Sequence, residues 1–126
     1  MSLLHKYVLY ASLGFLGISL IIPGLIEIFK VQAGSPDLVP ETIAAKNQLR
    51  ALNGVMTAMG FMALWACIDL ENAKVLTQAL GGMLLLVFAA RLYSFIIDGL
   101  PAFMTWVYAF IELLLAVIFL AWPPGK

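Results

Sequence analysis

The chain has 126 residues, with seven basic and seven acidic side chains and a formal net charge of zero. Hydrophobic residues make up 63% of it and charged residues 11%, against about 25% charged residues in an average soluble domain. A soluble domain of this size has too little interior to bury so much apolar surface, so the composition predicts an integral membrane protein. Without a net positive charge or a Lys/Arg run, nucleic acid is not expected as a partner.

The first span is expected to be retained rather than cleaved as a signal peptide. Residues 7–26 carry no charge, and this run is longer than the apolar region of a secretory signal. A single cysteine, Cys67, excludes an intrachain disulfide, and a single histidine, His5, excludes bis-histidine haem and multi-histidine metal sites. No metal site is predicted.

Four segments are long enough to cross about 30 Å of hydrocarbon as helices. Backbone groups in lipid must be satisfied internally, and such long apolar runs favour helices over barrel strands. Short turns between spans make neighbouring helices antiparallel. The sequence therefore predicts an all-α, up-down-up-down four-helix bundle in the membrane, forming a single domain over residues 1–126. The expected spans are residues 3–29, 46–68, 73–97 and 102–122, with a long loop at 31–45.

The connections suggest where helices begin and end. Pro40, Glu41 and Thr42 resemble the first turn of a helix, so the second helix is expected to begin ahead of its span. Asn72 is expected to cap the third helix. Gly99 is expected to adopt the left-handed conformation after that helix, with Pro101 starting the fourth.

Small residues predict close packing between the first two helices: Ala11, Gly14 and Gly17 in one, Gly54 and Ala58 in the other. With four spans both termini lie on one side of the membrane. Basic residues are split evenly between the two sides, so the positive-inside rule does not decide the orientation; we expect cytoplasmic termini. Glu27 and Lys30, near a helix end, are expected to reach toward the membrane surface.

Glu112 is the most informative residue, because it is the one charged side chain in an otherwise uncharged run from Gly99 to Gly125. An unpaired charge near the bilayer centre costs roughly 2.5–3.5 kcal/mol, so a partner is expected. Arg91 lies seven residues before Asp98, roughly 10 Å deep, and Glu112 roughly 15 Å deep in the same half of the membrane. The sequence therefore predicts an Arg91–Glu112 pair.

Helical spacing places Ser94 and Asp98 on the same face of the third helix as Arg91, and Tyr108 on the same face of the fourth helix as Glu112. Asn47 and Arg50 share a face of the second helix. Because their charges are complementary, we expect these faces to meet in a polar pocket. A purely structural ion-pair network is the alternative, although buried pairs rarely add net stability. The predicted pocket residues are Asn47, Arg50, Arg91, Ser94, Asp98, Tyr108 and Glu112.

Three motifs resemble a known family: Asn47-x-x-Arg50-x-x-Asn53-Gly54, Arg91 followed by Asp98-Gly99-x-Pro101, and Tyr108-x-x-x-Glu112. Together they resemble a bacterial family of small four-helix membrane proteins catalogued as a domain of unknown function, which is similar in layout to the DoxX-like proteins. The resemblance runs from the first span to Trp122. It implies a four-helix fold in the bacterial inner membrane. DoxX-like proteins include accessory subunits of quinone-linked enzymes, which implies partner membrane subunits.

Three functions are open from the sequence. The first is binding of a small amphiphilic molecule, such as a quinone or a lipid-like compound, with Arg50 and Arg91 holding an oxygen, Asp98 orienting Arg91, Glu112 neutralising it and Tyr108 donating a hydrogen bond. The second is an accessory subunit of a larger complex with purely structural charges. The third is an isomerase-type enzyme with Glu112 and Asp98 as acid and base. Lacking a nucleophile beside a base, the sequence favours a role without catalysis and no cofactor beyond bound lipid or quinone.

Overall fold

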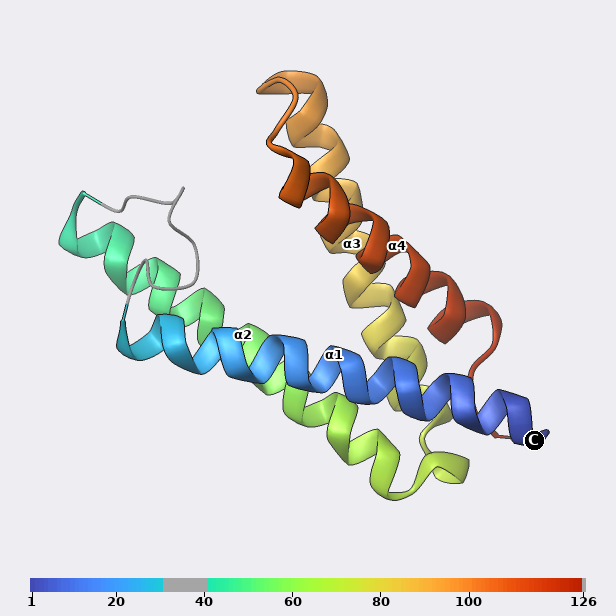
Figure 1. Ribbon diagram of the computed structural model, residues 1–126. Coiled ribbons are helices and arrows are strands. Elements are labelled where there is room, and N and C mark those ends of the chain that lie inside the picture. The colour runs from blue at the N-terminus through green and yellow to red at the C-terminus, as the bar shows by residue number, and fades with distance from the viewer. Residues whose placement is uncertain (31–40, 126) are drawn as a thin grey trace. The chain divides into compact units, whose positions relative to one another are not determined.

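A computed structural model describes residues 1–30 and 41–125 of the chain (Figure 1). Within these residues the fold is all-α, with four long helices and one short 3-10 helix. Each long helix is long and apolar enough to cross a membrane. The elements are α1 (Leu3–Phe29), α2 (Ile43–Ile68), η1 (Leu70–Asn72), α3 (Lys74–Ile97) and α4 (Phe103–Ala121).

The expected helix starts are met at one connection and missed at another. Helix α2 begins ahead of residue 46, and the Thr42 hydroxyl accepts a hydrogen bond from the Ala45 N–H at 3.0 Å, as an N-cap does. Pro40 lies outside the described residues. The prediction that Asn72 caps α3 is wrong. Asn72 ends η1 and donates to the Asp69 carboxylate at 2.9 Å, and α3 starts at Lys74.

The turn between α3 and α4 has the predicted backbone. Asp98 ends α3, and Gly99 follows it with φ of 103°, a conformation that side chains with a Cβ rarely adopt. Ala102 is extended and precedes the first residue of α4, Phe103. Pro101 therefore lies two residues ahead of the helix rather than in its first turn.

The described chain forms two compact units. The first, residues 13–68, pairs the C-terminal part of α1 with α2. Gly17 contacts Leu64 and Gly60, and Gly24 contacts Thr57, so the two helices run antiparallel. A Cβ at Gly60 would lie only 2.8 Å from the Gly17 carbonyl oxygen. Of the predicted small residues, Gly17 makes a close contact, whereas Gly14 and Gly54 have open space beside them.

The second unit contains residues 1–12 and residues from Asp69 onward. Helices α3 and α4 pack antiparallel, and a Cβ at Gly81 would lie 2.9 Å from Leu120 Cγ. Leu80, Leu84, Leu115 and Phe119 are buried at 5% exposure or less.

The chain ends meet within this second unit. The His5 ring stacks on the Trp122 indole, with ring centroids 4.3 Å apart, and its Nε2 lies 2.9 Å from the Trp122 carbonyl oxygen. Because a carbonyl oxygen only accepts, Nε2 must carry the proton in this bond. Nearby, Lys6 Nζ lies 3.7 Å from a Glu71 carboxylate oxygen.

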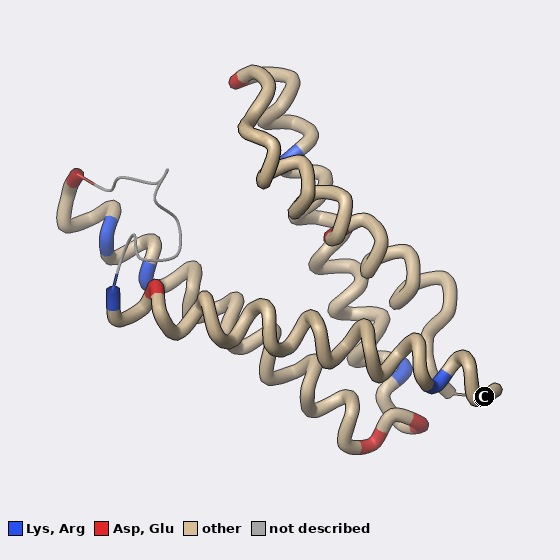
Figure 2. The backbone as a smooth tube through the Cα atoms, viewed as in Figure 1, with Lys and Arg blue, Asp and Glu red and all other residues tan. Residues whose placement is uncertain are grey.

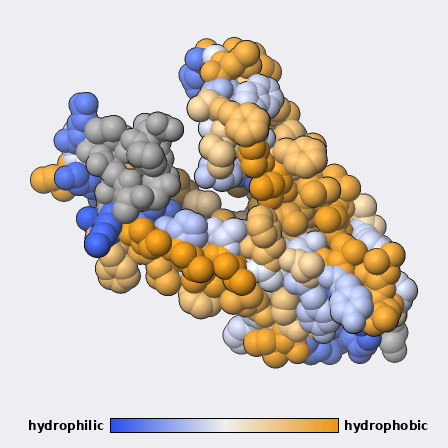
Figure 3. Space-filling model, viewed as in Figure 1, coloured by the Kyte–Doolittle hydropathy of each residue, from blue (hydrophilic) through white to orange (hydrophobic). Residues whose placement is uncertain are grey.

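Charge and hydropathy follow the expected membrane pattern. Lys, Arg, Asp and Glu gather near the helix ends, while the tube is otherwise almost entirely free of them (Figure 2). Apolar side chains cover much of the visible face in the space-filling view (Figure 3). Such outer surfaces suit contact with lipid tails rather than water.

Candidate functional site

The predicted partner of Glu112 is present. Arg91 on α3 donates from Nε to both carboxylate oxygens of Glu112 on α4, at 3.0 Å to Oε1 and 2.8 Å to Oε2. Arg91 belongs to the apolar helix α3 and Glu112 to the apolar helix α4, and each lies several residues from the α3–α4 turn. The Glu112 charge is therefore compensated by a charge-assisted hydrogen bond rather than left alone in hydrocarbon.

Glu112 occupies only one edge of the Arg91 guanidinium. Among the described residues, neither Nη1 nor Nη2 of Arg91 makes a hydrogen bond, and both are donors only. The Arg91 side chain is 31% exposed and that of Glu112 is 14% exposed. Glu112 is thus the more covered side chain of the two, and the Nη1 and Nη2 groups of Arg91 are donors without a partner among the described residues.

Asp98 and Ser94 form a second polar group at the end of α3. The Ser94 hydroxyl donates to Asp98 Oδ2 at 2.8 Å, and Asp98 is exposed. The structure thus gives Asp98 a different partner from the predicted one, since it is Glu112 and not Asp98 that holds Arg91. The two acids considered as an acid–base pair have separate donors.

Several aromatic residues of this hairpin lie toward the α3–α4 turn. Tyr108, one helical turn before Glu112, is 49% exposed, and its hydroxyl makes no hydrogen bond within the described residues. Phe95 and Trp106 contact each other across the helices, with ring centroids 4.7 Å apart. These rings provide apolar and polarisable surface at the end of the hairpin that also carries Arg91.

The remaining two predicted residues belong to the other unit. Asn47 and Arg50 are exposed in the first turns of α2. Arg50 Nη1 donates to the Ile28 carbonyl oxygen near the end of α1, where helix carbonyls lack intrahelical partners. The seven predicted residues are divided between two compact units, so their convergence in one pocket stays a prediction.

The buried polar residues, of which Glu27 and Thr77 are two, were not selected from the sequence as site residues. Glu27 is 5% exposed and so does not reach toward the membrane surface as expected. Helical periodicity contained a signal, because Glu27 is three residues after Gly24, on the α1 face that packs against α2. Thr77 on α3 is fully buried, and its hydroxyl has no hydrogen-bond partner among the described residues.

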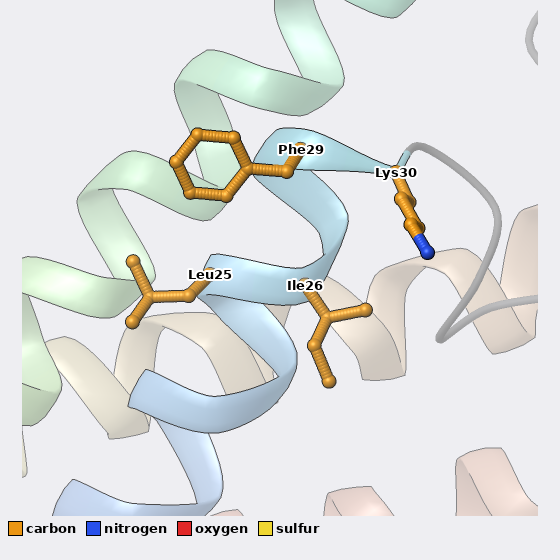
Figure 4. A pocket seen from close by; sticks show the side chains of 4 residues that line it. All are labelled: Leu25, Ile26, Phe29 and Lys30. Carbon is orange, nitrogen blue, oxygen red and sulfur yellow. The ribbon is translucent and has the colours of Figure 1, made fainter.

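A surface hollow of about 490 Å³ lies beside the last turns of α1 (Figure 4). Among the described residues, its lining comes from the end of α1 and the residue after it, and it contains none of the predicted site residues: Leu25, Ile26, Phe29 and Lys30. The Lys30 side chain extends away from the three apolar ones. Across residues 1–30 and 41–125, no group of three or more His, Cys, Asp or Glu side chains is placed to hold a metal ion.

Comparison with known proteins identifies the family but no activity. No curated protein and no solved structure matches the chain. Residues 8–123, which include all seven predicted site residues, match a family described as a domain of unknown function, DUF4345. The chain therefore belongs to the DUF4345 family.

Proposed function

We propose that this protein is a membrane protein that binds a small amphiphilic molecule, such as a quinone or a lipid-like compound, at the Arg91–Glu112 pair. The proposal includes four spans in up-down-up-down order, a DoxX-like layout, and a bacterial inner membrane with cytoplasmic termini. The observation that carries it is that Arg91, whose side chain is 31% exposed, contacts the Glu112 carboxylate through Nε and leaves its Nη donors without a partner among the described residues.

The free-energy cost of burying two charges supports a functional role for the Arg91–Glu112 pair. Desolvating two charges offsets much of their attraction, and apolar replacements of buried pairs are often as stable or more stable. Ionisable residues in membrane spans mark binding or transport sites more often than structure. In this reading Glu112 neutralises and orients Arg91, and the remaining N–H groups of the guanidinium hold an oxygen of the ligand.

The Glu112→Gln variant tests the proposal. The amide keeps the shape of the side chain but removes its charge, so Arg91 loses its anchor and should bind the native ligand less well. Mass spectrometry of organic extracts should find at least about a threefold smaller amount of the co-purified amphiphile per protein. The matched control is Glu71→Gln, which neutralises a carboxylate that is 71% exposed at the other end of the hairpin. Equal retention in wild type and Glu112→Gln would contradict the proposal.

A second candidate is an accessory subunit of a larger membrane complex. The observation favouring it is the abundance of large apolar side chains that are exposed on all four long helices, including Phe61, Trp65, Leu86 and Phe110 at 55–73% exposure. Such faces can pack against other spans as well as against lipid. Native mass spectrometry after mild detergent extraction distinguishes the two. A lone chain carrying a small molecule supports ligand binding, and an assembly of fixed stoichiometry with other chains supports the subunit.

A further inference from the structure

The charge of the Arg91–Glu112 pair restricts which ligands it can accept. Both Glu112 oxygens lie within 3.0 Å of Arg91 Nε, so the guanidinium already has its counter-ion and the pair is neutral. A carboxylate, sulfonate or phosphate added to it would create a net negative group inside hydrocarbon. A neutral ligand adds no charge and avoids that desolvation cost.

The polar atoms of the pair that have no partner among the described residues are donors. Arg91 presents Nη1 and Nη2, which carry four N–H groups and no lone pair for accepting a bond. Glu112, the only acceptor of the pair, is the more covered partner, at 14% exposure against 31% for Arg91. The geometry therefore suits a ligand oxygen that accepts hydrogen bonds, and disfavours a cation or a pure donor.

The surroundings strengthen the selection against anions. From residue 75 to residue 125 the chain has one positive side chain, Arg91, and two negative ones, Asp98 and Glu112. Asp98 is exposed at the turn, about 10 Å along α3 from Arg91. An anionic headgroup entering from this end meets a carboxylate first, and low dielectric strengthens the repulsion.

We infer that the Arg91 site selects a neutral carbonyl oxygen carried on a hydrocarbon chain and rejects anionic amphiphiles of the same length. This inference rests on the proposed function and names its ligand class. The carbonyl could belong to an ester of a membrane lipid or to a free ketone or quinone, and the two share the same hydrogen-bonding chemistry.

The test uses the purified protein in lipid nanodiscs and two radiolabelled probes, a long-chain methyl ketone and an alkyl sulfonate of equal chain length. The ketone should bind saturably, and the sulfonate at least about tenfold more weakly. Arg91→Lys keeps the charge but loses the planar fork, so it should weaken ketone binding roughly tenfold. Glu112→Gln leaves the guanidinium without its counter-ion, so it should weaken ketone binding and strengthen sulfonate binding at least about tenfold. Glu71→Gln should change neither.

The outcomes separate the two levels of the proposal. If neither probe binds saturably to the wild type, the proposed function fails. If the sulfonate binds as well as the ketone, or Glu112→Gln leaves the preference unchanged, the ligand class is wrong while the binding function stands. If a variant is misfolded by circular dichroism and gel filtration, the wild-type preference and the other variant still decide.

A second pair of nanodiscs distinguishes the sources of the carbonyl. Ether-linked phospholipids lack the acyl carbonyls of ester-linked ones. Tighter ketone binding in ether-lipid discs shows that lipid esters compete for the site and supports a lipid ligand. Equal binding in both discs supports a free ketone-like ligand. Tighter binding in ester-lipid discs contradicts competition for one carbonyl site and overturns the inference.

Discussion

At the scale of single residues, the Arg91–Glu112 pair compensates the Glu112 charge and leaves the Nη donors of Arg91 without a partner among the described residues. Glu112 requires a partner because it lies in the middle of an apolar helix, and Arg91 supplies one through Nε alone. The pair could be anticipated because a charge in hydrocarbon is costly and only one basic residue on the neighbouring spans lies at similar depth. Its one-edged geometry could not be anticipated, because sequence spacing fixes a helix face but not which nitrogen faces the acid.

Removing one partner of this pair should be far more damaging than removing both. Arg91→Met leaves the Glu112 carboxylate without its donor, and we expect a loss of about 2.5–3.5 kcal/mol of unfolding free energy. The Arg91→Met/Glu112→Met double variant carries no charge at this depth and should recover most of that loss. Equilibrium unfolding in detergent measures both. A double variant that is as unstable as the single one would show that the pair has an indispensable structural role.

Glu27 shows what a reading by position alone misses. It lies near a helix end, where acidic residues usually face the membrane surface, yet it is 5% exposed. The helix face on which Glu27 lies decides its exposure, rather than its position near the helix end. Glu27 follows Gly24 by three residues and lies on the side of α1 that packs against α2. Asn72 is a comparable case. Its amide closes a turn with the Asp69 carboxylate, a local competition between side chain and backbone that composition does not resolve.

At the scale of elements, the helix bounds were largely predictable and the packing faces were only partly so. The apolar runs define α1, α3 and α4 to within a residue of the expected spans, because hydrocarbon thickness sets helix length. Close contacts depend on rotation about each helix axis, which small-residue spacing constrains weakly. Gly17 was found in this way, but Gly60, which packs against it, was not.

Neighbouring glycines in α3 provide a matched pair of variants. A Cβ at Gly81 would lie 2.9 Å from Phe119 Cβ and from Leu120 Cγ, whereas a Cβ at Gly82 would meet nothing within 4 Å. Gly81→Ala should therefore lower the free energy of unfolding by about 1–3 kcal/mol. Gly82→Ala gains helix propensity and should raise it by up to about 1 kcal/mol. Thermal unfolding of both variants in one detergent checks the difference, and equal midpoints would contradict the α3–α4 packing.

At the scale of the whole molecule, contacts within one unit bring together segments that are far apart in the sequence. His5 contacts Trp122 and Lys6 lies beside Glu71, so both chain ends and the η1 turn lie together. The α3–α4 hairpin then carries its other turn, at Asp98–Pro101, to the far end of these helices. An even number of crossings is part of the proposed function and stays a prediction.

Site-directed labelling can test this topology. In a Cys67→Ala background, single cysteines at Ser2, Glu71 and Leu100 would be exposed to an impermeant maleimide. We expect the cysteines at positions 2 and 71 to be labelled from one side of the membrane, the cytoplasmic one, and the cysteine at 100 only from the other. Labelling of all three from the same side would contradict the four-span arrangement.

The contact between the chain ends should be sensitive to His5. His5→Ala removes an aromatic stack and a hydrogen bond, each worth about 0.5–1.5 kcal/mol. We expect faster amide hydrogen exchange at Trp122 and Gly125, since the two residues between them are prolines without an N–H, and little change in α4. The control is Tyr7→Ala, which removes a ring that is 63% exposed two residues away. Unchanged exchange in His5→Ala would show that the C-terminal residues are held by other contacts.

The stack of His5 on Trp122 also constrains the order of assembly during synthesis, since these residues are 117 positions apart. At 5–20 residues per second, the ribosome needs on the order of ten seconds to deliver the indole after the imidazole. The contacts between α1 and α2, by contrast, become available as soon as α2 has left the ribosome. The N-terminal residues of α1 must therefore remain in the membrane without their Trp122 contact until translation is nearly complete. Any delay in the synthesis of α4 would leave these residues available for contacts with other chains.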